Sequence, residues 1–473
     1  MNLTIPLSRL KSIVLLLFLL FLTFMITVAS QKIADRDSMV YITFTINGIL
    51  WVAFLIKDLK DKAFSLSIIH WLFCIFFFFF AGMIQSMNSR FPWIGDYKDS
   101  DLIKTNIVLL LWTLCFRFGQ NISNYSFSAK RKQISKNGIR SNSISWDGFE
   151  SKVIALSICA IAITLYRIVF VGFRNLFSRA TSNVSISDNS SLAVLIDKFA
   201  LATVYFAVVF SIYYLQHKKQ YKYFFVCSLC LLISYFPTST SRNAIAGLYF
   251  GALLAFCVSA KKKRWFVILY MLLFIIIFPL LNAFRSTAFS DVSFFKALNN
   301  TIKNLSSSWL AVDYDAYSMV SLTIRYVERN GITWGYQLLG VALFFVPRSI
   351  WHSKPISSGP FIAEKNGWWF TNVSEPLPAE MIINFGIIGM AISGILIGYF
   401  IGKIDKHFWN SIKCNSNNIY RFDSLYYYMI GYFLFLFRGA LLSAVAYLVP
   451  FIVLWWVLTR DSSKEEVVES ESL

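Results

Sequence analysis

Charged residues are scarce in this chain of 473 amino acids: Asp, Glu, Lys and Arg make up 15% of it, and the hydrophobic set makes up 57%. A typical soluble domain is about 25% charged and about 45–50% apolar. A chain with so few charges cannot hide its apolar side chains in a water-soluble core. The composition therefore excludes a soluble enzyme and a disordered scaffold.

Three sequence motifs that would point to other functions are also absent. The chain has no P-loop, no glycine-rich Rossmann fingerprint and no HExxH. Nucleotide-driven transport and zinc proteolysis therefore lack support.

The apolar residues come in runs of about 15–22, separated by short charged patches. This pattern is typical of an all-α, polytopic transmembrane helical bundle, whereas a β-barrel would alternate in segments of about ten residues. We predict twelve spans: Ser12–Ser30, Val40–Ile56, Ala63–Gln85, Thr105–Tyr125, Val153–Phe173, Phe199–Gln216, Tyr223–Pro237, Asn243–Ala260, Trp265–Phe284, Ala379–Ile401, Ser424–Phe437 and Ala440–Leu458.

The Lys and Arg residues between the spans predict their orientation. If the spans alternate, the basic connections fall on one face, which is then cytoplasmic, as are both termini. The first apolar run lacks a small-residue cleavage site and is expected to be a span rather than a removed signal. The formal charge of +19 then reflects contact with anionic lipid head groups, and no nucleic-acid partner is expected.

The chain is expected to divide into four parts. Residues 1–284 hold nine spans with short loops, and residues 285–378 form one large outside segment. Residues 379–459 hold the last three spans, and residues 460–473 form an acidic cytoplasmic tail.

Two stretches of the outside segment have recognisable patterns. Trp309–Arg329 has the spacing of an amphipathic helix and is expected to rest on the membrane domain. Trp334–Trp351 is apolar but contains Gln337, Pro347 and Arg348. We expect it to be a helix in or against the outer leaflet, because counting it as a span would place the later basic connections outside.

Arginines at the outer ends of spans are the main functional candidates, because a charge at the membrane edge is costly. The strongest are Arg242, in the tight turn PTSTSRN, and Arg438, in the equivalent late turn. Guanidinium groups that converge on one face can bind phosphate or diphosphate bidentately, although lipid head groups are an alternative partner for any one of them. Neither of these two arginines is expected to be part of the packed interior. The substrate-binding candidates are Arg174, Arg179, Arg242, Arg285, Arg348 and Arg438, and Arg167 also lies near an outer end.

Two residues are candidate general bases. His352 is the one histidine of four that falls outside, and it can accept a proton from a sugar hydroxyl or simply lie at the interface. Glu380 lies near the outer membrane boundary, five residues after Glu375, in SEPLPAEMIINFGIIG. It can act as a base, pair with an arginine, or sit at a helix N-terminus because the dipole favours it there.

Two acidic triplets, Asp35-Arg36-Asp37 and Asp313-Tyr314-Asp315, have the form of pairs that hold a divalent cation in lipid-phosphate-sugar chemistry. Such triplets are frequent by chance, and the first has a basic residue at its centre. We therefore expect no metal site and no cofactor.

The chain resembles the bacterial O-antigen polymerase, or oligosaccharide repeat-unit polymerase, family. The layout is similar along nearly the whole chain, with a large outside segment before the last three spans. The local similarities are TSTSRNAIAGLYFGALLAF, FFVPRSIWHSKP and PAEMIINFGIIGMAISG, the Arg438-Gly439 pair, and the basic residues Arg174 and Arg179 in a mid-chain outside loop.

This resemblance implies a metal-independent glycosyltransferase of the GT-C type in the bacterial inner membrane. Such an enzyme joins undecaprenyl-diphosphate-linked oligosaccharide units into a surface polysaccharide at the outer face. Its donor is already activated, so no nucleotide site is needed. The implied partners are the lipid-linked oligosaccharide, the bilayer, and a chain-length regulator and a flippase of the same pathway.

Three alternatives remain open. An O-antigen ligase would have a similar arginine face but pass the glycan to a lipid A core. A metal-dependent lipid-phosphate-sugar transferase would use Asp35 and Asp37. A flippase or transporter would need a polar path at mid-membrane, for which Arg117 and Arg167 are the plausible residues.

Overall fold

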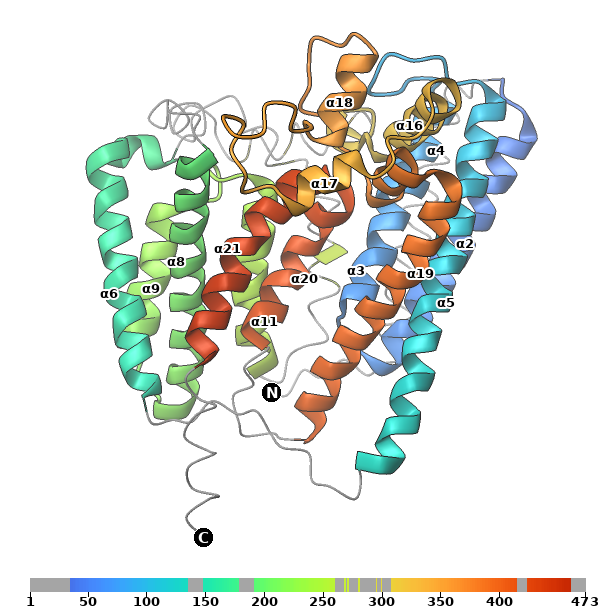
Figure 1. Cartoon of the computed structure of the whole chain (residues 1–473). Helices are drawn as coiled ribbons and strands as arrows, with labels where there is room; N and C mark the ends of the chain where they lie inside the picture. Colours follow the sequence, from blue (N-terminus) through green and yellow to red (C-terminus); the bar gives the residue numbers. More distant parts are fainter. Residues whose placement is uncertain are drawn as a thin grey trace.

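The computed structural model describes residues 35–134, 148–177, 191–259, 308–414 and 423–460, together with six single residues between 268 and 299. All regular structure in these ranges is helical. Most of the helices run side by side in one bundle, and a few short ones cover one end of it (Figure 1). The all-helical class predicted from the composition is therefore confirmed.

Seven helices in the described ranges are long and apolar enough to cross a membrane. A helix needs about 20 residues to span a hydrocarbon core of about 30 Å, and the chain is accordingly a multi-pass membrane protein. These helices are α2 (Ser38–Asp61), α3 with η1 and α4 (Leu66–Phe73, Cys74–Phe80 and Ala81–Met87), α5 (Asp99–Ile134), α6 with η2 and η3 (Phe149–Arg167, Ile168–Gly172 and Phe173–Phe177), α8 (Ser191–Lys218), α19 (Leu377–Cys414) and α21 (Leu441–Arg460).

Three further predicted spans are present as helices that are not among these seven. They are α9 (Lys222–Ser234), α10 with η4 and α11 (Arg242–Ile245, Ala246–Phe250 and Gly251–Ser259), and α20 (Asp423–Arg438). The 13 residues of α9 and the 16 of α20 extend only about 20 and 24 Å at 1.5 Å per residue. Of two further predicted spans, Ser12–Ser30 lies outside the described residues and Trp265–Phe284 lies outside them except for single residues, so the count of twelve stays a prediction.

The centre of the bundle is the helix made by α3, η1 and α4. From Ala63 to Gly82 every side chain is buried, including the phenylalanine run from Phe76 to Phe80. Neighbours on several sides, among them α2 and α20, pack against it. This helix therefore forms the core around which the other spans are arranged.

One end of the bundle is covered by α16 (Ala316–Asn330), α17 (Tyr336–Ala342) and α18 (Ser358–Lys365), and we call it the capped end (Figure 1). The amphipathic helix expected over Trp309–Arg329 is present as α16, and its first half is buried against α5 and α19. The prediction that Trp334–Trp351 is one helix was wrong, because α17 ends at Ala342. A helix continued through Pro347 would press the proline ring against the carbonyl of Leu343.

Near the capped end, α19 is interrupted at Gly386, whose φ of 71° and ψ of −168° are accessible to glycine and costly for other residues. The break frees backbone carbonyls that a continuous helix would use. The Thr333 amide donates to the Ile383 carbonyl at 2.8 Å, and the Gly335 amide donates to the Asn384 carbonyl at 3.2 Å. The first two turns of α19 are thereby fixed to the segment before α17.

Candidate functional site

The two arginines that the sequence singled out converge on the second acidic triplet. Arg242 begins α10 and forms an ion pair through Nη2 with Asp313. Arg438 ends α20, and its Nη2 lies 3.0 Å from Oδ1 of Asp315 and 3.1 Å from the Val312 carbonyl oxygen. The triplet belongs to the turn η6 (Val312–Tyr314) and the residue after it, just before α16. Residues from three distant parts of the chain thus form one charged site at the capped end.

The close packing of α20 against η4 brings the two arginines together. Gly431 of α20 lies against the Ala246 carbonyl, where any added Cβ would overlap the backbone. Glycine at this position lets the two helices approach more closely than other residues would allow. Since Arg242 precedes η4 and Arg438 ends α20, this contact fixes the positions of both guanidinium groups.

Asp315 is the centre of the site and is 1% exposed. Its Oδ1 accepts from the Ser374 hydroxyl at 2.6 Å and from Arg438, and its Oδ2 accepts from the Trp93 indole at 2.9 Å and the Ser374 amide at 3.2 Å. A carboxylate with this many donors is held in one orientation. It therefore holds the Arg438 side chain in place.

Arg438 retains donors for a further acceptor. A guanidinium group has five N–H donors, and within the described residues only Nη2 of Arg438 forms hydrogen bonds. Its Nε is buried without a partner in the same part of the structure. The side chain is 25% exposed, so a ligand can reach it. An anion with several oxygens, such as a phosphate, matches the unused donors.

Glu380 lies beside this site but is 1% exposed, and both of its oxygens are bonded. Oε1 accepts from the Leu441 amide at 2.6 Å, and Oε2 accepts from the Ser358 hydroxyl at 2.6 Å. Leu441 is the first residue of α21, three residues after Arg438. In this structure Glu380 thus caps α21 and fixes the turn that carries Arg438.

Glu375 is a buried carboxyl group that the sequence singled out only for its place before α19. Oε1 accepts from the Thr323 hydroxyl at 2.7 Å, while Oε2 is buried without a partner among the described residues. Burial, and then the nearby Glu380 carboxylate, raise the pKa of Glu375 well above its usual range.

His352 and Arg348 lie together in the loop after α17, and both are exposed. Arg348 donates to the carbonyl oxygens of Lys354 at 2.7 Å and Pro355 at 3.4 Å, so it braces its own loop. Within the described ranges the His352 ring forms no hydrogen bond or ion pair, and it is open to a substrate.

The other arginines do not join the Arg242–Arg438 site. Arg174 is exposed in η3, and Arg167 pairs with Asp197 in α8 at 3.0 Å. Arg179 and Arg285 lie outside the described residues. The arrangement of seven converging arginines therefore reduces, in the described part of the chain, to one pair.

The first acidic triplet has local structural roles. Arg36 pairs with Asp99 at 2.7 Å, and the Asp37 side chain accepts from the Met39 amide at 2.9 Å, capping α2. In the ranges that the structure covers, no three His, Cys, Asp or Glu side chains are grouped so that they could hold a metal ion.

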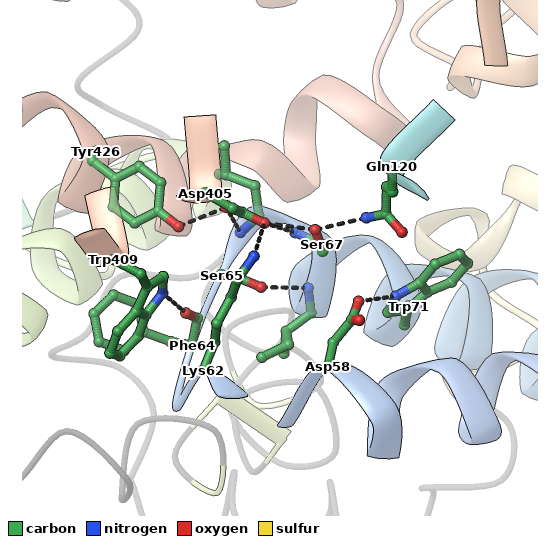
Figure 2. A network of polar contacts seen from close by, with 12 residues as sticks. Asp58, Lys62, Phe64, Ser65, Ser67, Trp71, Gln120, Asp405, Trp409 and Tyr426 are labelled. Carbon is green, nitrogen blue, oxygen red and sulfur yellow. Dashed lines mark hydrogen bonds and ion pairs between the residues drawn. The ribbon is translucent and has the colours of Figure 1, made fainter. Parts of the chain in front are cut away.

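Figure 2 shows a second buried polar network, which involves the part of α19 near its C-terminal end, away from the capped end (Figure 1). Asp405 of α19 is fully buried and accepts from the Leu66 amide at 2.9 Å, the Ser67 amide at 3.1 Å and hydroxyl at 2.5 Å, and the Tyr426 hydroxyl at 2.7 Å. Lys62 lies 3.7 Å away. These donors satisfy both oxygens, so this network joins α3, α19 and α20 structurally.

Arg117, the residue considered for a mid-membrane path, belongs to the same end of the bundle. Its Nη1 lies 2.7 Å from Asp58 and 2.9 Å from the Gln120 side-chain oxygen. The Gln120 amide in turn donates to the Ser67 hydroxyl at 2.7 Å. The charge of Arg117 is therefore compensated within the protein.

Sequence reasoning missed the residues that orient the arginine pair. Trp93, Ser358 and Ser374 each donate to a carboxylate far away in the chain. No local spacing marks such partners, because only the tertiary fold brings them together.

Comparisons with known proteins do not assign this site. The chain matches no family model, no curated protein and no solved structure.

Proposed function

We propose that this protein is a polymerase that joins undecaprenyl-diphosphate-linked oligosaccharide units into a surface polysaccharide. The observation that carries the proposal is the convergence of Arg242 and Arg438, at the capped end, on a single turn. Two fixed guanidinium groups at one end of a membrane bundle suit a ligand with a lipid tail and a diphosphate head. In this proposal the capped end is the outer face of the bacterial inner membrane, and both termini are cytoplasmic.

The reaction requires the transfer of one glycosyl group. The bond between the anomeric carbon of the growing chain and its diphosphate oxygen breaks, and a bond from that carbon to a hydroxyl oxygen of the next unit forms. The hydroxyl proton moves to a base, and the lipid diphosphate leaves with the electron pair. Arg242 and Arg438 stabilise the negative charge that develops on the leaving group, without a metal ion.

Of the two candidate bases, His352 is the one with an accessible side chain in this structure. We assign it the proton transfer and assign Glu380 a positioning role, because the oxygens of Glu380 hold α21 and Ser358.

The carboxylates of Asp313 and Asp315 keep the arginines in place before the substrate binds. A diphosphate carries more charge than one carboxylate and has more acceptor oxygens, so it can engage the donors of Arg438 that the carboxylate leaves unused. The ligase alternative requires the same arginine pair, and the two reactions differ in the acceptor.

Activity should persist after metal removal, because the arginines supply the positive charge. The test uses proteoliposomes of the full chain with lipid-diphosphate-linked repeat units extracted from the host, with and without EDTA. We expect an equal ladder of chain lengths in both samples, and an equal ladder for the double variant Asp35→Asn/Asp37→Asn.

A ladder that disappears in EDTA and returns with magnesium or manganese would favour the metal-dependent transferase. A sample with no ladder in either condition, at normal protein content, would contradict the polymerase assignment.

A further inference from the structure

Three charged side chains form a separate cluster where α6 meets α8. Nη1 of Arg167 lies 3.0 Å from Oδ1 of Asp197, and Nζ of Lys198 lies 2.9 Å from Oδ2 of the same carboxylate. The guanidinium carbon of Arg167 lies 4.5 Å from the ring centre of Tyr235, the residue that follows α9. Nζ of Lys198 lies 5.0 Å from the ring centre of Tyr447 in α21. The four helices lie side by side in Figure 1.

This cluster lies toward the capped end but is distinct from the arginine pair. Tyr235 directly follows α9, seven residues before Arg242, and Tyr447 lies two turns into α21, which begins after Arg438. None of the hydrogen bonds or ion pairs of Arg167 and Lys198 in the described ranges reaches the acidic triplet. The presence of these charges therefore does not follow from the arginine pair.

The charges in the cluster do not balance. Two cations share one carboxylate, which leaves one positive charge. The guanidinium and ammonium groups have five and three N–H donors, and within the described residues each forms one hydrogen bond, to Asp197. Nε of Arg167 is buried without a partner there. The side chains of Arg167 and Lys198 are 18% and 20% exposed, so both can meet a ligand.

The surroundings of the cluster are apolar and face outward. Phe170 in η2, Phe173 in η3 and Ile196 in α8 are exposed large hydrophobic side chains. Phe170 and Phe173 follow Arg167 in the chain, so exposed apolar side chains lie on the chain beyond this cation. An uncompensated positive charge among apolar side chains of a membrane protein is costly unless an anion joins it or the side chain extends to the interface.

We propose that Arg167 and Lys198 bind the phosphate of an anionic phospholipid in the leaflet at the capped end. The planar guanidinium fork matches two phosphate oxygens, and the ammonium group supplies a point charge beside it. Asp197 holds the two cations next to each other. The acyl chains then lie along the exposed faces of α6 and α8, and the added negative charge neutralises the cluster.

The test is native mass spectrometry of the full chain in detergent, after incubation with equal amounts of phosphatidylglycerol and phosphatidylcholine of different mass. We expect the wild type to retain phosphatidylglycerol preferentially. Arg167→Gln/Lys198→Gln should lower its retention by about tenfold or more, since charged hydrogen bonds are lost. The control Arg329→Gln, an exposed cation of α16, should behave as wild type.

Asp197→Asn provides an independent readout. This substitution removes the carboxylate charge that competes with the lipid phosphate for the two cations, so we expect the retention of phosphatidylglycerol to rise. If the ion pair were purely structural, the retention would be unchanged or lower. Unchanged retention in Arg167→Gln/Lys198→Gln would overturn the proposal. Binding of inorganic phosphate by the lipid-free protein, with no preference for phosphatidylglycerol, would overturn the lipid as the ligand. Displacement of bound phosphatidylglycerol by inorganic phosphate would support recognition through the phosphate.

Discussion

Replacing Arg242 or Arg438 by alanine is expected to reduce chain elongation by about tenfold to a thousandfold. Each variant removes fixed positive charge from the position where the leaving diphosphate develops negative charge. Lysine keeps the charge but loses the planar fork, so the Arg→Lys variants should fall between wild type and alanine. The measurement is the rate of ladder formation in proteoliposomes at matched protein content, with Lys60→Ala, exposed at the opposite end, as the control.

A second comparison separates anion binding from a structural ion pair. If Arg242 served only to pair with Asp313, Asp313→Asn should lower activity as much as Arg242→Ala. If Arg242 binds the diphosphate, Asp313→Asn should retain most of the activity, because the arginine remains. Equal losses in the two variants would contradict the assignment.

The two arginines differ in how they affect folding. From the sequence, neither was expected to belong to the packed interior; the Arg438 side chain is 25% exposed, but its partner Asp315 is buried. Arg438→Ala leaves that carboxylate without one of its donors, at a cost of about 1–3 kcal/mol. The activity of this variant therefore has to be expressed per folded molecule, and Arg438→Lys is the more informative substitution.

Asp405→Ala is expected to cause a large loss of stability, of about 3–5 kcal/mol, because it leaves buried donors and Lys62 without their shared partner. The network that it removes joins α3, α19 and α20 at the end opposite to the arginine pair (Figure 2). The measurement is the thermal unfolding midpoint in detergent. Asp405→Asn, which keeps one acceptor oxygen, should be intermediate.

The matched control is Lys403→Ala, an exposed position on the same helix. If Asp405→Ala unfolds at the same temperature as Lys403→Ala, the network contributes nothing to stability and the structural role is wrong. At a temperature where both variants are folded, their activities per folded molecule should match, since neither residue lies near the arginine pair.

The sequence predicted the membrane class because hydropathy is a local property, and a run such as Val40–Ile56 is visible in any short window. It also identified Arg242 and Arg438, because bulky cations in tight turns between spans are unusual. The sequence did not predict that α9 ends at Ser234, three residues before the end expected for its span, since a short helix inside a bundle can bury its ends against neighbours.

The sequence did not predict which residues pair with the two arginines. Asp313 and Asp315 were weighed as a metal-binding triplet, because no local pattern reveals that distant turns bring cations to them. The role of Glu380 as a cap for α21 depends on the place of Leu441, which is set by tertiary packing.

The most direct test of the polymerase assignment is a comparison of lipid-linked glycans extracted from host cells with and without this chain. The account predicts that single repeat units on the lipid diphosphate accumulate without the chain and that long chains return with the wild type but not with Arg242→Ala. Full-length unattached chains in its absence would indicate a ligase instead, and an unchanged glycan profile would contradict a role in glycan assembly.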